Sequence, residues 1–590
     1  MVISLRPETT APAALPLREA RVVVQRLLTI ARTFSGFGLA FGIDVLTRRR
    51  SDNQSLRAQH LKTSLVELGP TFIKLGQLLS CRPDLVPPVY AQVLADLQDQ
   101  VPPFSFDIAA QTIEAELGHP WEQIYTELDS TPVASASLGQ VYKARLKTGE
   151  WVAIKVQRTG LQAHISLDLR ILRHLASLYQ TVLPFIHSDL VAVVDELTRR
   201  LLAEIDYIQE GQNAQTFARM YGHLPRIRVP RIYWRYTRRR ILTMEWIDGI
   251  KITEGERIRE WGFDPAELIA LGFQFSLQQL LEGGFFHADP HPGNLLITPE
   301  GKIAYLDFGM VSTIDPLIRD QLLVSLFHLI VEDFDGLAQD YVDLGFLPAE
   351  TDLSALIPEF RQAFTHIRMA KVTEFGFRQT YEQLEHLVYD YPFQVPDYYL
   401  LVLRCFGTLE GIAIQLNPTL QAFEQAYPYL IEQLLTRQSP TVTACFNQLL
   451  IQNQQLNWEQ ISDFLDQFDP AQGAMLESLW DTTLDLLLSP QGQSLRNTLA
   501  VELSTRQTQL WNQVRQDMTL YVNPGMLPPR HIVMEQPYNA LGNLINRLSN
   551  LAENELFQSP WLAMLPRMVG NPKVWRLMTV MIQEVGAVSR

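Results

Sequence analysis

The sequence predicts an α+β protein in which a strand-rich region stands between helical segments. Short runs with alternating apolar and β-branched residues occur within 131–250, and such runs are typical of strands. A second pair of short apolar runs, separated by a turn, occurs within 295–309. The remaining chain shows mostly helical patterns. Together these observations indicate strands gathered in the middle of a largely helical chain.

Length and composition limit the class of protein. The chain has 590 residues, too many for one hydrophobic core, so we expect two or more domains. Apolar residues make up 47%, which suits globular cores and is too few for a polytopic membrane protein. The net charge of −15 argues against a general nucleic-acid binder. The three cysteines, Cys81, Cys405 and Cys445, are far apart and form no CxxC, so neither disulfides nor a zinc site are predicted.

Five ranges follow one another along the chain. Residues 1–50 have a Pro/Ala-rich start and a semi-apolar segment. Residues 51–130 have helical patterns interrupted by prolines. Residues 131–250 carry the strand-like runs SLGQVYKARL, WVAIKVQ and RRRILTMEWI, with a helical block from about Leu190 to Phe217 between the second and third. Residues 251–430 are mostly helical apart from one hairpin, and 431–590 form a helical tail rich in Gln, Leu and Asn. We expect these ranges to correspond to separate parts of the fold.

The semi-apolar segment Leu27–Leu46 has two interpretations. It is flanked by arginines on both sides, and it contains Arg32 and Asp44. Such a segment could lie in a lipid interface. It could equally be a helix that packs on the rest of the protein, and we slightly prefer packing because the segment is not cleanly amphipathic.

The most informative stretch is HADPHPGNLLITPEGKIAYLDFG, from His287 to Gly309. Its two apolar runs, separated by Thr-Pro-Glu-Gly, predict an antiparallel hairpin. Asp289 and Asn294 precede the first strand, and Asp307 follows the second. In a hairpin these positions lie at one end, so the three polar side chains converge. Two carboxylates and an amide oxygen suit magnesium and phosphate chemistry. Capping and turn roles are the alternative for any one of these residues alone.

HADPHPGN followed by LDFG resembles the catalytic loop and DFG motif of the protein-kinase fold. The resemblance implies that Asp289 orients or deprotonates the phosphoryl acceptor, and that Asn294 and Asp307 bind Mg²⁺. The arginine that usually follows the histidine is absent, and Ala288 takes its place. After Gly309, a helix is expected by Pro316, with no long activation segment and no APE motif.

Upstream residues extend the resemblance to a nucleotide site. WVAIKVQ resembles the strand whose lysine contacts the α- and β-phosphates, which implies that role for Lys155. The covering loop reads ASASLGQV and has one glycine where ordinary kinases have three, so Ala and Ser stiffen it. The resemblance implies that ATP and Mg²⁺ are the cofactors. The residues that it assigns to nucleotide binding are Ala134, Ser135, Ala136, Ser137, Gly139, Val141, Lys155 and Glu245.

The alanine-rich loop points to one family. With the VAIK lysine, the ExDY segment, MEWIDG, HADPHPGN, LDFG and a KxGQ motif, the chain resembles the UbiB (aarF-domain, ADCK-type) atypical kinases over about residues 55–430. The resemblance implies a two-lobed protein-kinase-like fold with an N-terminal helical extension and a helical C-terminal tail. In that fold the extension, which carries KxGQ, covers the active site.

The resemblance also assigns charged partners around this extension. Lys74 and Gln77 would occupy the space of a peptide substrate, and Glu204 and Asp206 would support Lys74. Glu210 would pair with Lys155. Six positions on one helix separate Glu204 and Glu210, so both cannot face one lysine.

The function implied is a magnesium-dependent ATP-binding protein, an ATPase or a small-molecule or lipid kinase. Three alternatives stay open: a nucleotide-sensing pseudokinase scaffold, a protein kinase, and, far less favoured, a metal-dependent hydrolase built on His287, Asp289 and His291.

The family's role implies support of isoprenoid-quinone or prenyl-lipid metabolism. ATP, prenyl-lipid or quinone intermediates and a membrane surface would be the partners, without nucleic acid. We expect peripheral binding at the cytoplasmic side of a bacterial or organellar membrane, because the C-terminal residues are too interrupted by charge for a transmembrane pair.

Overall fold

The computed structural model describes residues 17–47, 53–80, 86–95, 97, 103–136, 138–182, 190–330, 332–369 and 393–416, and parts of 429–456, 484–501 and 572–581. Ser137, Cys81 and most of the expected tail therefore lie outside the described residues. The chain divides into two compact units. Unit 1 comprises Met1–Ile314 and Gly376–Ala422, and unit 2 comprises Asp315–Phe375 and Phe423–Arg590.

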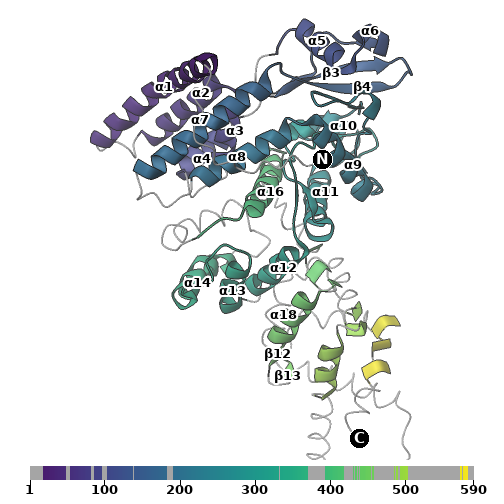
Figure 1. The fold of residues 1–590 in the computed structure, drawn as a ribbon. Coiled ribbons are helices and arrows are strands. Elements are labelled where there is room, and N and C mark those ends of the chain that lie inside the picture. The colour runs from purple at the N-terminus through teal and green to yellow at the C-terminus, as the bar shows by residue number, and fades with distance from the viewer. Residues whose placement is uncertain are drawn as a thin grey trace, which may run out of the picture. The chain divides into compact units, whose positions relative to one another are not determined.

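Unit 1 contains a five-stranded antiparallel sheet that includes all three strands expected from the sequence (Figure 1). Its order is β1-β3-β4-β6, with β2 paired to β3. The strands are β1 (Tyr125–Leu128), β2 (Ala134–Ser135), β3 (Gly139–Leu146), β4 (Trp151–Gln157) and β6 (Ile241–Glu245). Val152, Ile154 and Val156 of β4 are buried in a core shared with α5 (Phe106–Leu117). Because strand side chains alternate, Lys155 lies on the opposite face of the sheet.

Three helices connect β4 to the last part of this sheet. They are α7 (Leu161–Val182), α8 (Leu190–Glu204) and α9 (Tyr207–Tyr221). The helical block expected from Leu190 corresponds to α8 and α9, and α7 was not expected from the sequence. The block is not one helix, because the chain breaks between Glu204 and Tyr207, where the Asp206 side chain accepts the Ile208 amide and caps α9.

Four N-terminal helices pack together in unit 1. They are α1 (Leu17–Leu46), α2 (Gln54–Leu68), α3 (Pro70–Ser80) and α4 (Pro88–Ala95), and α3 also packs on α7 and α8. Ile30 of α1 is buried against Leu68 and Phe72. The interpretation of Leu27–Leu46 as a packed helix is therefore confirmed for the side of the helix that carries Ile30. Gly76 makes this packing possible, since a Cβ there would meet Leu97 Cδ1 at 2.3 Å.

The second sheet of unit 1 carries the predicted hairpin. β9 (Leu295–Ile297) and β10 (Ile303–Tyr305) pair antiparallel, and the sheet order is β5-β10-β9-β7 with β5 (Ile227–Arg228) and β7 (Ile250–Lys251). β8 (Phe285–His287) pairs separately with β11 (Val311–Thr313). Phe217 of α9 packs beside the hairpin, with ring centroids 5.4 Å from Tyr305 and 5.2 Å from Phe308. This aromatic core supports the end of the hairpin where the polar residues lie.

Beyond the hairpin sheet, unit 1 contains the short α10 (Gly255–Glu260), α11 (Pro265–Gln278) and α16 (Asp397–Leu416), which packs on α11. By length and composition alone, α16 is the one described helix that could cross a membrane, over Tyr398–Leu416. No sequence feature singled out this helix, since the only candidate for membrane contact was the Leu27–Leu46 segment, at a lipid interface. Phe406 of α16 packs on Phe273 of α11 with ring centroids 6.1 Å apart, as expected for a core helix.

Unit 2 is helical in its described part. Its longer helices are α12 (Pro316–Ile330), α13 (Phe334–Asp343), α14 (Leu353–Met369) and α18 (Pro440–Leu450), followed by the two-stranded pair β12 (Ile451–Gln452) and β13 (Gln455–Leu456). α12 begins at Pro316, as predicted. α13 packs on both α12 and α14, and α18 packs on α12.

Candidate active site

His287 ties together the two segments that carry the aspartates. Its Nδ1 accepts the Asp289 amide at 3.3 Å, so the proton lies on Nε2, which donates to the carbonyl oxygen of Asp307. Burial lowers the pKa of His287, which keeps the ring neutral. The Leu306 amide donates to the Asn294 carbonyl at 3.0 Å. The backbone positions of Asp289, Asn294 and Asp307 therefore lie at one end of the hairpin, where the sequence predicts that their side chains converge.

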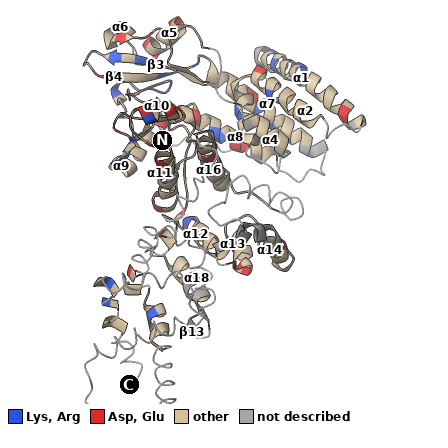
Figure 2. Cartoon of the chain, turned by 180° about the vertical axis from the view of Figure 1, so that it is seen from behind, with Lys and Arg blue, Asp and Glu red and all other residues tan. Residues whose placement is uncertain are grey.

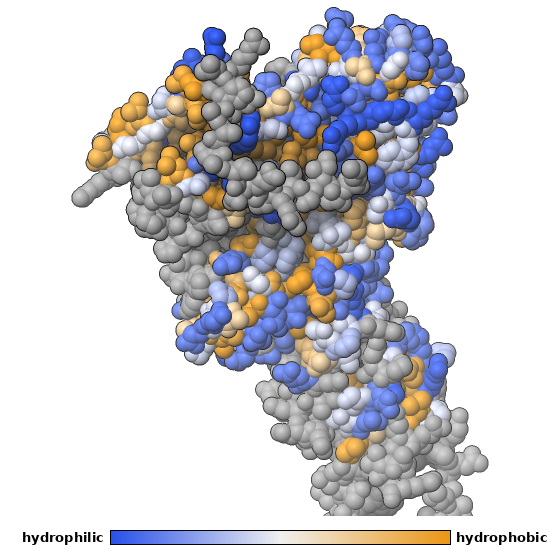
Figure 3. Space-filling view, viewed as in Figure 1, coloured by the Kyte–Doolittle hydropathy of each residue, from blue (hydrophilic) through white to orange (hydrophobic). Residues whose placement is uncertain are grey.

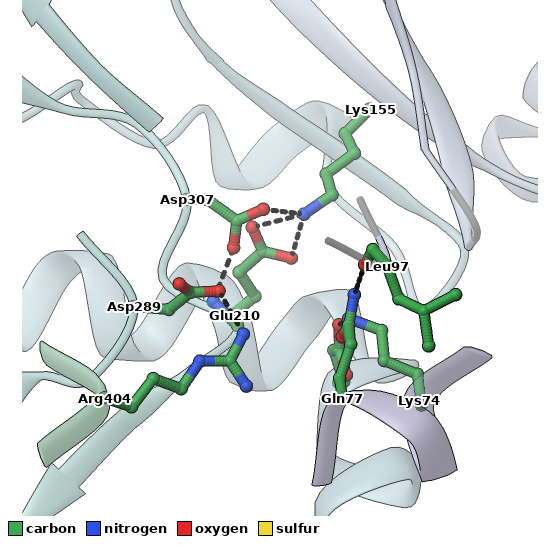
Figure 4. A network of polar contacts seen from close by, with 10 residues as sticks. Lys74, Gln77, Leu97, Lys155, Glu210, Asp289, Asp307 and Arg404 are labelled. Carbon is green, nitrogen blue, oxygen red and sulfur yellow. Dashed lines mark hydrogen bonds and ion pairs between the residues drawn. The ribbon is translucent and has the colours of Figure 1, made fainter. Parts of the chain in front are cut away.

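Lys155 of β4 lies between two carboxylates (Figure 4). Its Nζ is 2.8 and 2.9 Å from the Glu210 oxygens and 2.8 Å from Asp307 Oδ2. Burial disfavours the ammonium, but Asp307 and Glu210 raise the pKa of Lys155 well above its usual value. Burial raises the pKa of Glu210 to about 7, and for Asp307 the charge of Lys155 overcomes burial and holds the pKa below its usual range.

Asp289 pairs with a residue that the sequence analysis missed. Arg404 of α16 donates through Nη2 to Asp289 Oδ2 at 2.9 Å (Figure 4). Both side chains are about one-fifth exposed, at 19% and 20%. HADPHPGN contains no Lys or Arg, so α16 supplies the cation that the loop lacks. No motif marks Arg404, which lies 115 positions further along the chain.

The alanine-rich loop is held by Arg158, which was also missed. The Arg158 guanidinium donates to the Ala136 carbonyl at 3.2 Å and to Ser135 Oγ at 3.3 Å. The Ala136 amide donates to the Gly139 carbonyl at 2.8 Å, which closes the turn between β2 and β3. These bonds fix the loop backbone on both sides of the turn.

Gly139 is required for packing. A Cβ there would lie 2.5 Å from Tyr207 Oη and 2.6 Å from the Val156 carbonyl oxygen. The single glycine of the loop thus lets β3 approach β4 and α9 closely. This packing role goes beyond the nucleotide contact that the resemblance implies for Gly139.

The KxGQ motif on α3 lies next to the site. Lys74 forms an ion pair with Glu204, the last residue of α8. An ideal Cβ on Gly309 would be 3.5 Å from Glu204 Cγ, so this ion pair adjoins the segment that carries Asp307. Gln77 donates to the Leu97 carbonyl oxygen. The two extension residues therefore have polar partners within unit 1, and Figure 4 shows the bond between Gln77 and Leu97.

Two residues have contacts that differ from those expected. Asp206 caps α9 and pairs with Arg239 at 3.3 Å, whereas the sequence analysis assigned it to Lys74. The helix break before α9 explains the difference, because it turns Asp206 into a capping residue. Glu245 ends β6, and its carboxylate accepts from Arg228 and from the Arg231 amide, so these two bonds already engage its side chain.

The donor set fits a magnesium ion that phosphate oxygens help to hold. Asp289, Asn294 and Asp307 offer hard oxygens, and such sites use one or two carboxylates together with phosphates. Among the described residues, no group of three or more His, Cys, Asp or Glu could hold a metal by itself. Both ring nitrogens of His287 are bonded to backbone, and His291 Nδ1 accepts the Gly293 amide at 3.1 Å. These bonds argue against the hydrolase built on His287, Asp289 and His291.

Comparisons with known proteins decide the family. The model of the ABC1 atypical kinase-like domain matches residues 96–341. An uncharacterized protein of Synechocystis sp. is 45% identical over 496 residues, covering 83% of this chain and 73% of the relative. The chain belongs to the ABC1 atypical kinase-like family. The two-lobed kinase-like fold expected from the motifs is therefore confirmed as the fold of this family.

Other relatives of this ABC1 family chain come from the same cyanobacterium and from a plant. A second uncharacterized Synechocystis protein is 39% identical over 509 residues, covering 84% of this chain and 89% of the relative. The protein named ACTIVITY OF BC1 COMPLEX KINASE 3, chloroplastic, of Arabidopsis thaliana is 40% identical over 474 residues, covering 80% of this chain and 67% of the relative. The domain match takes in every site residue above except Lys74, Gln77 and Arg404.

Proposed function

We propose that this chain binds ATP with Mg²⁺ and transfers its terminal phosphoryl group to water or to a small or lipid acceptor. The supporting observation is the meeting of Lys155, Glu210 and Asp307 within 2.9 Å. A lysine held between two carboxylates is fixed in place for phosphate contact. Glu210 positions Lys155, and Asp307 and Asn294 supply oxygens for the metal. The bound metal would neutralise charge on the phosphates.

The surroundings of Asp289 favour a small acceptor or water. Arg404 holds one Asp289 oxygen, so the carboxylate is oriented by a cation rather than left open. On the other side of the site, the Lys74–Glu204 pair brings α3 close to Gly309. These contacts support the exclusion of a peptide substrate, and they make the protein-kinase alternative the less favoured one.

Membrane association and a role in isoprenoid-quinone or prenyl-lipid metabolism form part of this proposal. α1 exposes a row of apolar side chains on the side away from its packed residues, and Figure 3 shows apolar atoms gathered over this helix. The most exposed are Val22, Val24, Leu28, Leu39, Ile43 and Leu46. Exposed apolar residues beside arginines, which are blue in Figure 2, suit a lipid interface.

Magnesium-dependent ATP hydrolysis by the full chain tests the proposal, with and without anionic lipid vesicles. Asp307→Asn is the test variant, because it removes the charge that the metal and Lys155 need. We expect it to lower turnover by at least about a hundredfold and to weaken Mg·ATP binding. Asp195→Asn is the matched control, since Asp195 forms an exposed pair with Arg173 on α7.

Each outcome separates the alternatives. Turnover that rises with vesicles and is lost only in Asp307→Asn supports the membrane-responsive ATPase. Nucleotide binding without turnover in any condition would favour the nucleotide-sensing scaffold. Equal Mg·ATP affinity in Asp307→Asn and the unaltered chain would refute the metal assignment.

A further inference from the structure

Unit 2 contains a second cluster of reactive groups, centred on His328 of α12. His328 Nδ1 donates to Asp340 Oδ2 of α13 at 2.6 Å. Its Nε2 lies 3.3 Å from Cys445 Sγ of α18. Gln321 Nε2 donates to the other Asp340 oxygen at 2.7 Å. The cluster therefore forms a chain from amide to carboxylate, imidazole and thiol across three packed helices.

These contacts place the groups in the arrangement that activates a nucleophile. A thiol becomes a good nucleophile when a base lies within hydrogen-bond reach and a third group orients that base. Here Cys445 is the thiol, His328 the base and Asp340 the orienting group. Asp340 is fixed in turn by Gln321, so the ring has one preferred orientation. No part of the proposed ATP chemistry uses these residues.

The local packing maintains the arrangement. His328 and Cys445 are largely buried, at 9% and 7% exposed. A Cβ on Gly336 would lie 2.8 Å from His328 Nε2, so a glycine is needed where the first turn of α13 meets the ring. The helices are thus packed tightly around the ring, and the thiol cannot move far from it.

The charges facing His328 favour its protonated form. Burial opposes the charge, but the bonds to Asp340 and Cys445 raise the pKa of His328 to about 10. Asp333, which caps α13, also faces Nε2 at 3.8 Å. Asp343 lies near Asp340 and raises the pKa of Asp340 together with burial. An imidazolium beside a thiol stabilises the thiolate.

We propose that Cys445 is a modification site, a nucleophilic sulfur that reacts with hydroperoxides. The sulfur attacks one peroxide oxygen, so an S–O bond forms as the O–O bond breaks. Sulfur is oxidised by two electrons to the sulfenic acid, and the peroxide is reduced. The leaving oxygen takes the proton from His328 Nε2. This yields neutral imidazole and water from hydrogen peroxide, or neutral imidazole and an alcohol from an organic hydroperoxide. The proposal is independent of the ATP chemistry proposed for unit 1.

The pH dependence of alkylation tests this on the full chain. Iodoacetamide labelling of each cysteine is followed by peptide mass spectrometry between about pH 6 and about pH 8. Cys405 of α16 is the internal control, because burial raises the pKa of its thiol to about 12. We expect labelling of Cys445 to change less than about twofold, and that of Cys405 to rise about tenfold per pH unit.

Variants and a trapping reagent complete the test. Asp340→Asn removes the orienting charge, and we expect its Cys445 labelling to become steeply pH-dependent. Dimedone after hydrogen peroxide should mark Cys445 in the unaltered chain and not in this variant. Labelling of Cys445 that rises about tenfold per pH unit in the unaltered chain, or no labelling while the chain is folded, would overturn the proposal. The comparison of Cys445 with Cys405 in the same sample tests whether Cys445 is activated even if Asp340→Asn fails to fold.

Discussion

At the scale of single residues, substitution of Arg404 gives the most direct test of whether an oriented Asp289 carboxylate is needed for turnover. Arg404→Gln removes a charge-assisted bond of 2.9 Å from a partly buried carboxylate. Such bonds contribute about 1.5–3 kcal/mol, so we expect ATP turnover to fall by about 10- to 150-fold. ATP affinity should change little, because Arg404 does not contact Lys155 or Asp307. Arg404→Lys should restore part of the rate.

Steady-state hydrolysis and a separate nucleotide-binding titration measure these two effects. Arg173→Gln is the control, since its partner Asp195 is exposed. If Arg404→Gln turned over ATP at the unaltered rate, Arg404 would be a structural residue only.

Gly139 allows a second test at this scale. Gly139→Ala places a methyl group 2.6 Å from the Val156 carbonyl oxygen and 2.5 Å from Tyr207 Oη. Overpacking of this kind costs about 1–3 kcal/mol of unfolding free energy. Gly38→Ala on α1 is the matched control, because nothing lies within 4 Å of its added Cβ. Urea unfolding of both variants compares them, and equal midpoints would contradict the packing role.

Residues in contiguous motifs could be predicted from the sequence, and residues that act from a distance could not. Asp289, Asn294 and Asp307 share one hairpin, so local geometry alone brings them together. The Lys155–Glu210 contact came from resemblance. Arg404 and Arg158 belong to no motif, and only tertiary packing places them. Asp206 was misassigned because a carboxylate before a helix can either cap it or form an ion pair.

At the scale of elements, the sequence indicated the type of each strand better than the ends of each helix. The strands β3, β4 and β6 fall within the runs expected for them, because alternation marks a half-buried strand directly. The break between α8 and α9 was missed since helical periodicity continues across it. That break, and not the angle between positions on one helix, separates Glu204 from Glu210.

The packing of α12, α13 and α18 should depend on pH through His328. Its pKa rises from 6.5 to about 10 on folding. A raised folded-state pKa contributes stability that is fully present below the unfolded value. We therefore expect the melting temperature of unit 2 to fall as pH rises from about 6.5 to about 10. His328→Gln should flatten this part of the profile in calorimetry of the full chain, and an unchanged slope would count against the charged ring.

At the scale of the whole molecule, the ion pair between α3 and α8 connects the N-terminal helices to the proposed nucleotide site. Lys74→Glu places two acids together and should lower unfolding free energy by about 3 kcal/mol or more, because one partly buried charge loses its partner. The double variant with Glu204→Lys restores an opposite-charge pair, so we expect it to recover at least half of the loss. Urea unfolding of the two single variants and the double variant measures this double-mutant cycle. A double variant no more stable than Lys74→Glu would show that loss of the ion pair does not cause the destabilisation.

The His287 ring has a consequence for following this site in solution. Since Nδ1 accepts an amide and Nε2 carries the proton, the nitrogen NMR shifts of this ring should have the pattern of a single fixed tautomer. Most neutral imidazole rings in water exchange between their two tautomers. One of the 12 histidines therefore serves as a built-in reporter: a change in its spectrum when nucleotide is added would register movement of the Asp307 segment relative to the Asp289 loop without any attached label.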